Sequence, residues 1–199
     1  MKSRFLMWCI SAGADGESAG LLWLDLGSRY CEPHRHYHTL DHIGASLAHL
    51  DGVGVNPIVE GAIWFHDAIY DPTRDDNELR SAEYFLEVTK DWIDPARAEN
   101  IQRLILATDF RTESGDDPDV HLMLDIDLAV LSAPATDYDG YRDAIRREYG
   151  HVPDEDFRKG RAAVVRRFLE KPIYRTAAYQ LRETVARENI LRELAILGG

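Results

Sequence analysis

Histidine and aspartate residues that could bind a metal ion lie in three short segments of the 199-residue chain. The first segment holds His38 and His42, and the second holds the doublet His66-Asp67. The third places Asp127 in an otherwise apolar stretch, where a carboxylate is costly to bury unless it is paired or binds a metal. Imidazoles and carboxylates without thiolates suit a divalent ion such as Mn, Mg, Zn, Fe, Co or Ni, and argue against a closed structural zinc site.

The strings around these residues resemble those of the HD superfamily of metal-dependent phosphohydrolases, which is named for its His-Asp doublet. Tyr37-His38 with His42, then Trp64-Phe65-His66-Asp67, then Asp127-Leu128 carry the resemblance. More narrowly, the chain resembles the small family of predicted metal-dependent HD phosphohydrolases. That likeness extends over nearly the whole chain, through residues 29–43, 62–71, 124–131 and 145–149, Asn77-Glu78, Ser81-Ala82 and Gly160-Arg161.

The resemblance implies four metal ligands, which are His42, His66, Asp67 and Asp127. It also implies catalytic roles for Asp67 and for His38, because the first histidine of a Tyr-His-x-x-x-His string is the proton donor in related phosphodiesterases. One departure concerns a second metal ion: no histidine occurs between positions 67 and 120, so the extra ligands of several HD branches are not evident.

The chemistry of such a site follows from its ligands. Four ligands leave open positions on an octahedral ion for a water molecule and a phosphate oxygen, and the ion lowers the pKa of that water. On a helix His38 and His42 would share a face, so His38 could protonate the leaving oxygen. The expected reaction is hydrolysis of a phosphate ester or phosphoanhydride in a small phosphorylated metabolite, with a nucleotide as the expected substrate.

The remaining phosphate charge calls for cationic or polar side chains. The candidates are Arg35, Asn77, Glu78, Arg80, Arg146 and Arg161. Asn77 and Glu78 have an equally good alternative as the capped start of a helix. Charge supports a role for the last two arginines: residues 1–141 hold 26 acidic and 10 basic residues, whereas residues 142–199 hold 9 and 13. The basic C-terminal part could therefore supply a phosphate-binding wall.

The elements that must position these residues are predicted to be helices, because apolar residues recur at spacings of three and four. Strand signals are nearly absent. We therefore expect residues 1–199 to form a single all-α HD-type helical bundle of about eight to ten helices. The expected helices are a short N-terminal one, 17–30, Tyr37–Leu50, Pro57–Asp67, Asn77–Thr89, Pro95–Thr108, His121–Leu131, Tyr138–Tyr149, Pro153–Leu169 and Ile173–Leu197.

Composition limits the partners and the compartment. A net charge of -12 argues against a nucleic-acid polymer as ligand. No apolar stretch approaches the roughly 18 residues of a membrane helix, so no membrane contact is expected. Cys9 and Cys31 form no disulfide framework, which favours the cytoplasm.

Three other functions compete with hydrolysis of a phosphate. One is an HD-fold di-iron oxygenase, which needs about six ligands, and another is a non-catalytic sensor that binds a nucleotide and a metal. The third rests on Gly16-Glu17-Ser18-Ala19-Gly20, which matches the nucleophile elbow of α/β-hydrolases. That elbow requires a strand before it and a parallel sheet beneath it, and the sequence predicts neither.

Overall fold

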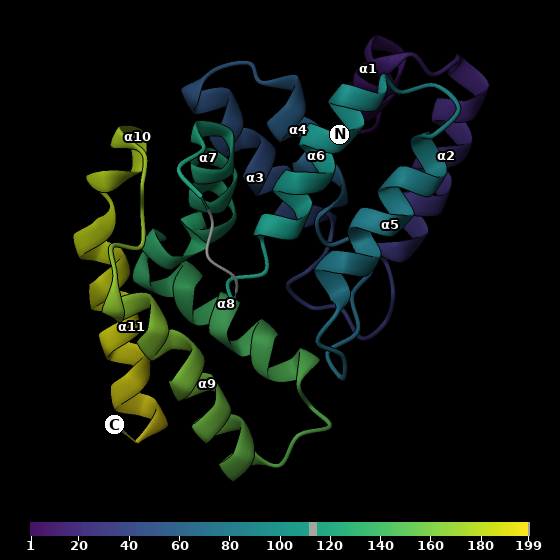
Figure 1. The fold of residues 1–199 in the computed structure, drawn as a ribbon. Coiled ribbons are helices and arrows are strands. Elements are labelled where there is room, and N and C mark those ends of the chain that lie inside the picture. Colours follow the sequence, from purple (N-terminus) through teal and green to yellow (C-terminus); the bar gives the residue numbers. More distant parts are fainter. Residues whose placement is uncertain (112–114, 199) are drawn as a thin grey trace.

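The computed structural model describes residues 1–111 and 115–198, and all regular structure in this part of the chain is helical (Figure 1). The all-α prediction is confirmed. Eleven α-helices and one 3-10 helix lie within these residues, slightly more than the eight to ten expected. They are α1 (Lys2–Ala12), α2 (Gly16–Arg29), α3 (Leu40–Val53), α4 (Pro57–Phe65), α5 (Asn77–Thr89), α6 (Pro95–Ala107), α7 (Pro118–Asp127), η1 (Leu128–Ser132), α8 (Ala135–Glu148), α9 (Asp154–Glu170), α10 (Ala177–Gln180) and α11 (Glu183–Leu197).

Helix α4 is the central element of the N-terminal helices, and it packs against α3, α6 and α7. It begins with Pro57 after the Asn56 cap, whose side chain accepts hydrogen bonds from two backbone N–H groups. Its last seven residues are almost all buried. Phe5 of α1 packs edge-to-face on Trp64, with ring centroids 5.1 Å apart. This packing fixes the C-terminal end of α4, from which the His66-Asp67 doublet follows directly.

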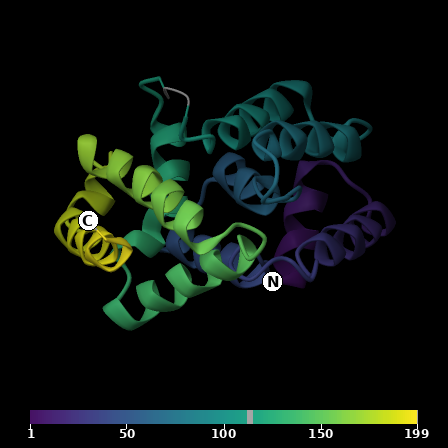
Figure 2. The ribbon, with the colours of Figure 1, turned by 90° about the horizontal axis from the view of Figure 1, so that it is seen from below.

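The C-terminal helices form a second group, because α8 and α11 pack on η1 and α9 packs on α11. Figure 2 shows this group on the side of the molecule away from α1 and α2. Tyr138 of α8 and Arg161 of α9 both contact Glu193 of α11, whose side chain is fully buried. These contacts fix α9 relative to the rest of the group.

Two predicted helices differ most from the structure, and the helix expected over His121–Leu131 is divided into α7 and η1. His38 precedes α3 and is not on its face: Thr39 is the N-cap, and its hydroxyl accepts from the N–H of Asp41. The segment expected as one helix over Ile173–Leu197 begins as a loop. There the buried Asp125 accepts hydrogen bonds from the backbone N–H of Arg175 and of Thr176, at 2.9 and 2.7 Å. These bonds hold Arg175 and Thr176 in the segment before α10, with Thr176 in an extended conformation, so the expected single helix is divided into α10 and α11.

No helix among the described residues is both long and apolar enough to cross a membrane.

Candidate metal centre

Four side chains from three separate parts of the fold converge on one point. His42 projects from the first turn of α3, His66 and Asp67 follow α4, and Asp127 ends α7. The two imidazole Nε2 atoms are 3.2 Å apart, and His66 Nε2 is 3.1 Å from Asp67 Oδ2. Asp127 Oδ1 is 3.1 Å from His42 Nε2 and 3.4 Å from His66 Nε2. The structure therefore brings together all four predicted metal ligands.

The geometry of this cluster fits a divalent cation. Neighbouring ligand atoms around an octahedral ion with bonds near 2.1 Å are about 3 Å apart, which is close to the separations seen here. Asp67 Oδ2 is buried and receives no hydrogen bond, so a cation would satisfy it. Among the described residues, His42, His66 and Asp67 are the one group of three or more such side chains with all ligand atoms within 4.8 Å of one another.

A backbone contact sets the orientation of His66. Its Nδ1 lies 3.0 Å from the carbonyl oxygen of Ile63, so Nδ1 carries the proton and Nε2 is left to bind a metal. Burial disfavours a charge on His66, but the carboxylates of Asp67 and Asp127 outweigh burial and raise its pKa well above the usual value. The same imidazoles overcome the effect of burial on Asp67 and Asp127 and hold the pKa of each carboxyl below its usual range. The pKa directions of His66, Asp67 and Asp127 thus follow from their mutual contact, and a bound cation would replace the proton on His66 Nε2.

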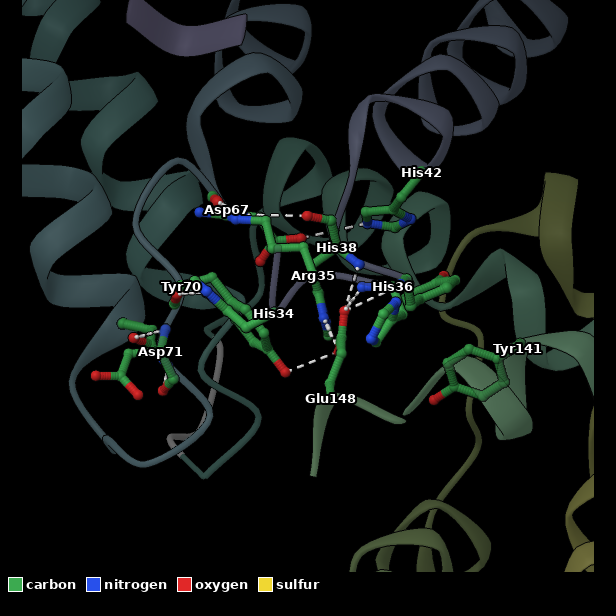
Figure 3. Close-up of polar contacts among 12 residues, drawn as sticks. His34, Arg35, His36, His38, His42, Asp67, Tyr70, Asp71, Tyr141 and Glu148 are labelled. Carbon is green, nitrogen blue, oxygen red and sulfur yellow. Dashed lines mark hydrogen bonds and ion pairs between the residues drawn. The ribbon is translucent and has the colours of Figure 1, made fainter. Parts of the chain in front are cut away.

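Glu148, the last residue of α8, positions His38 beside this cluster (Figure 3). Its Oε1 accepts from the backbone N–H groups of His36, Tyr37 and His38 at 2.7, 2.7 and 3.0 Å. Its Oε2 lies 2.7 Å from His38 Nδ1 and accepts from the hydroxyl of Tyr70 at 2.9 Å. One buried carboxylate therefore fixes both the backbone and the ring of His38, and it leaves His38 Nε2 for the cavity.

The pKa values of this pair reflect their contact. Burial opposes the charge on Glu148, but the hydrogen bond from His38 and the backbone N–H groups lower its pKa to about 2. For His38 burial also opposes the charge, and the carboxylates of Asp67 and Glu148 raise its pKa overall. The ring of His38 also stacks on Tyr70, with centroids 4.1 Å apart. The contact with Glu148 therefore favours the protonated form of this imidazole.

Arg35 holds the turn that carries the doublet. Its guanidinium donates to the carbonyl oxygens of Asp67 at 2.6 Å, Ala68 at 3.1 Å and His38 at 3.1 Å, and it pairs with Glu32 at 2.9 Å. The side chain is fully buried. With its donors committed to these carbonyls, Arg35 supports the segment before α3 and the turn after α4, and it does not face the cavity described next.

A cavity of about 580 Å³ opens beside the cluster, and His38, His66, Asp67 and Asp127 line it. Of the six predicted substrate-binding residues, Asn77, Glu78 and Arg161 also line this cavity. Asn77 is partly committed to the loop, since it bonds both the N–H and the carbonyl of Asp71. Burial raises the pKa of Glu78, and Asp109 and Asp67 add to that effect.

Arg80 and Arg146 are not among the lining residues. Arg80 forms an exposed ion pair with Asp76 at 2.9 Å. Arg146 donates to the carbonyl oxygens of Tyr149 and Val152 at the end of α8, and its charge lies over the ring of Phe157. The basic C-terminal part thus places Arg161, but not Arg146, at the cavity.

A second cavity of about 620 Å³ lies against the same cluster. His42 and Asp127 line it, together with Arg147 and Arg182. Asp127 lines both cavities, as do the rings of Tyr37 and Tyr141, whose centroids are 4.6 Å apart. The cluster is consequently bordered by open space on two sides.

Sequence reasoning missed Glu148 as a residue of the site. One signal was present: a carboxylate at the C-terminal end of a helix faces the negative end of the helix dipole, which is unfavourable without another partner. It also missed Tyr70, Arg74 and Arg111 as lining residues of the cavity.

No family model, curated protein or solved structure matches this chain. The assignment of a function therefore rests on the chemistry of the site.

Proposed function

We propose that this protein is a metal-dependent phosphohydrolase of the HD type, acting on a phosphate ester or phosphoanhydride in a small metabolite. The observation that carries the proposal is the convergence of two imidazoles and two carboxylates on the wall of a cavity that His38 also lines. His42, His66, Asp67 and Asp127 would hold one divalent ion. When bound, the ion supplies Lewis acidity and lowers the pKa of water.

His38 would donate a proton to the leaving oxygen. Glu148 holds His38 Nδ1, so the proton available to a ligand in the cavity is the one on Nε2. The contact with Glu148 also stabilises the imidazolium before transfer, and the stacking on Tyr70 limits the orientation of the ring. A general acid fixed in this way needs little reorganisation during the reaction.

Arg161 would contribute positive charge to the cavity without moving freely in it. It pairs with Glu193 at 2.8 Å and donates to the hydroxyl of Tyr141 at 3.1 Å. These contacts leave its side chain only 8% exposed. Its role would be to orient the phosphate rather than to neutralise it.

The test is turnover of a panel of phosphomonoesters, nucleotides and cyclic nucleotides with Mn²⁺, Mg²⁺, Zn²⁺, Fe²⁺, Co²⁺ or Ni²⁺. The expected result is metal-dependent release of phosphate or cleavage of the ester. His66→Ala should abolish both turnover and stoichiometric metal binding. His121→Ala is the matched control, because His121 of α7 lines neither cavity.

Metal analysis separates this proposal from its competitors. One ion per chain with turnover supports the hydrolase, whereas two iron ions per chain with oxygen-dependent chemistry would indicate the oxygenase. Metal-dependent turnover that survives His66→Ala would refute the assignment.

A further inference from the structure

One face of α9 lines the cavity along most of the length of the helix. Phe157, Gly160, Val164 and Phe168 follow one another at spacings of three and four, so they share a face. Val164 is 46% exposed although it is a branched apolar residue. A Cβ placed on Gly160 would meet no atom within 4 Å, so the space beside this helix is open.

Other apolar side chains extend this surface. Phe110, which is 42% exposed, packs edge-to-face on Phe168 with ring centroids 5.7 Å apart. The cavity thus has a continuous apolar side in addition to the polar cluster. The further apolar lining residues are Leu128, Val130, Leu131, Ile145 and Val152.

The charged groups of the cavity are mostly negative. Its lining includes six carboxylates and three guanidinium groups, so a divalent ion and a protonated His38 together would only bring the formal total to zero. Each guanidinium already has a carboxylate partner: Arg74 contacts Asp76 at 2.6 Å, and Arg111 contacts Asp109 at 2.8 Å. Arg161 has Glu193, as described above. The cavity therefore holds little positive charge for a polyphosphate.

We infer that the substrate is a phosphomonoester with a single phosphate group and a large apolar organic group. The phosphate would lie against the metal ligands and His38, and the apolar group would lie along α9. A nucleoside triphosphate fits poorly, because its additional negative charges would face carboxylates and arginines that already have carboxylate partners. This inference rests on the proposed hydrolase function for the position of the phosphate.

Binding of n-alkyl phosphonates, which cannot be hydrolysed, tests the inference without requiring turnover. Calorimetry would compare methyl, propyl and hexyl phosphonate, with and without Mn²⁺. If α9 receives the chain, Kd should fall about fourfold for each added methylene group. Adenosine triphosphate should bind more weakly than hexyl phosphonate.

Gly160→Leu tests the location of the apolar group. Leucine favours a helix more than glycine does, and its side chain would enter the open space beside α9, so the variant should fold and partly fill the cavity. The ratio of the methyl to the hexyl Kd should approach one. Gly20→Leu is the matched control: Gly20 lies in α2, has no atom within 4 Å of its Cβ position and lines neither cavity.

The outcomes separate the two proposals. A chain-length dependence that Gly160→Leu removes, without turnover of any phosphate ester, supports the binding surface and refutes the hydrolase. Equal affinity for methyl and hexyl phosphonate, or tighter binding of the triphosphate, overturns the inference even when phosphatase activity is present. A chain-length dependence that Gly160→Leu leaves intact also overturns it.

Discussion

Glu148→Gln should destabilise the protein by about 3 kcal/mol at neutral pH. Folding lowers the pKa of Glu148 from its ordinary value of 4.5 to about 2, and each unit of difference corresponds to about 1.4 kcal/mol. Glutamine can keep the three backbone N–H bonds through its carbonyl oxygen. Its NH₂ group would then face the Nδ1–H of His38, so the charge-assisted bond is lost.

The direction of the pKa shift determines how the stability contribution of Glu148 changes with pH. A carboxyl whose pKa is lower in the folded than in the unfolded protein contributes stability that is fully present above pH 4.5. That contribution declines as the pH falls, and it disappears as the pH passes through about 2. The contribution of the Glu148 carboxylate to the stability difference between wild type and Glu148→Gln should therefore be fully present at pH 6 and vanish near pH 2.

Urea denaturation at a series of pH values measures the difference. Glu188→Gln is the control, because Glu188 is an exposed residue of α11, and it should change the free energy of unfolding by less than about 0.5 kcal/mol. A stability for Glu148→Gln within that margin of wild type at pH 7 would refute the reasoning. So would a difference that grows as the pH falls from 4.5 towards 2.

Three further results are expected. Asp127→Asn should remove most of the thermal stabilisation that wild type gains from a divalent ion. For an ion at one hundred times its Kd that stabilisation is about 2.7 kcal/mol, which calorimetry would record as a rise in Tm of roughly 5–10 °C. Arg35→Lys should cost roughly 2–3 kcal/mol in urea denaturation, because an ammonium group cannot reach all the carbonyls that the guanidinium binds; an unchanged midpoint would contradict this role. Gly61→Ala should cost about 1–3 kcal/mol by the same measurement, because its Cβ would lie 2.6 Å from Trp8 and 2.7 Å from Ile101, whereas Gly20→Ala should not destabilise.

Local pattern was sufficient to predict most of the helices. Helix α5 spans Asn77–Thr89, as its spacing and flanking loop indicate, and α4 begins at Pro57 as expected for a proline in the first turn. The helix boundary before His42 was wrong because Thr39 caps the helix through its own hydroxyl, and this local interaction outweighs the favourable spacing of Tyr37 and His38.

In the candidate site, too, residues that are close in sequence could be predicted, whereas contacts between distant residues could not. His66 and Asp67 are neighbours in sequence, so their proximity required no knowledge of the fold. Glu148 contacts residues 110 to 112 positions away, and no local pattern carries that information. Arg35 shows the same effect. Its charge indicated a phosphate-binding role, but the carbonyl oxygens that accept hydrogen bonds from its guanidinium are brought to it only by the fold.

Asp127 borders both cavities, and this position has a kinetic consequence. His66 and Asp67 line the cavity beside α9, whereas His42 lines the other one. An ion held among these side chains would remain open to exchange through one cavity while a ligand occupied the other. Ligand and ion need not leave in a fixed order, so a chelator should strip the metal from the ligand-bound protein without waiting for the ligand to dissociate.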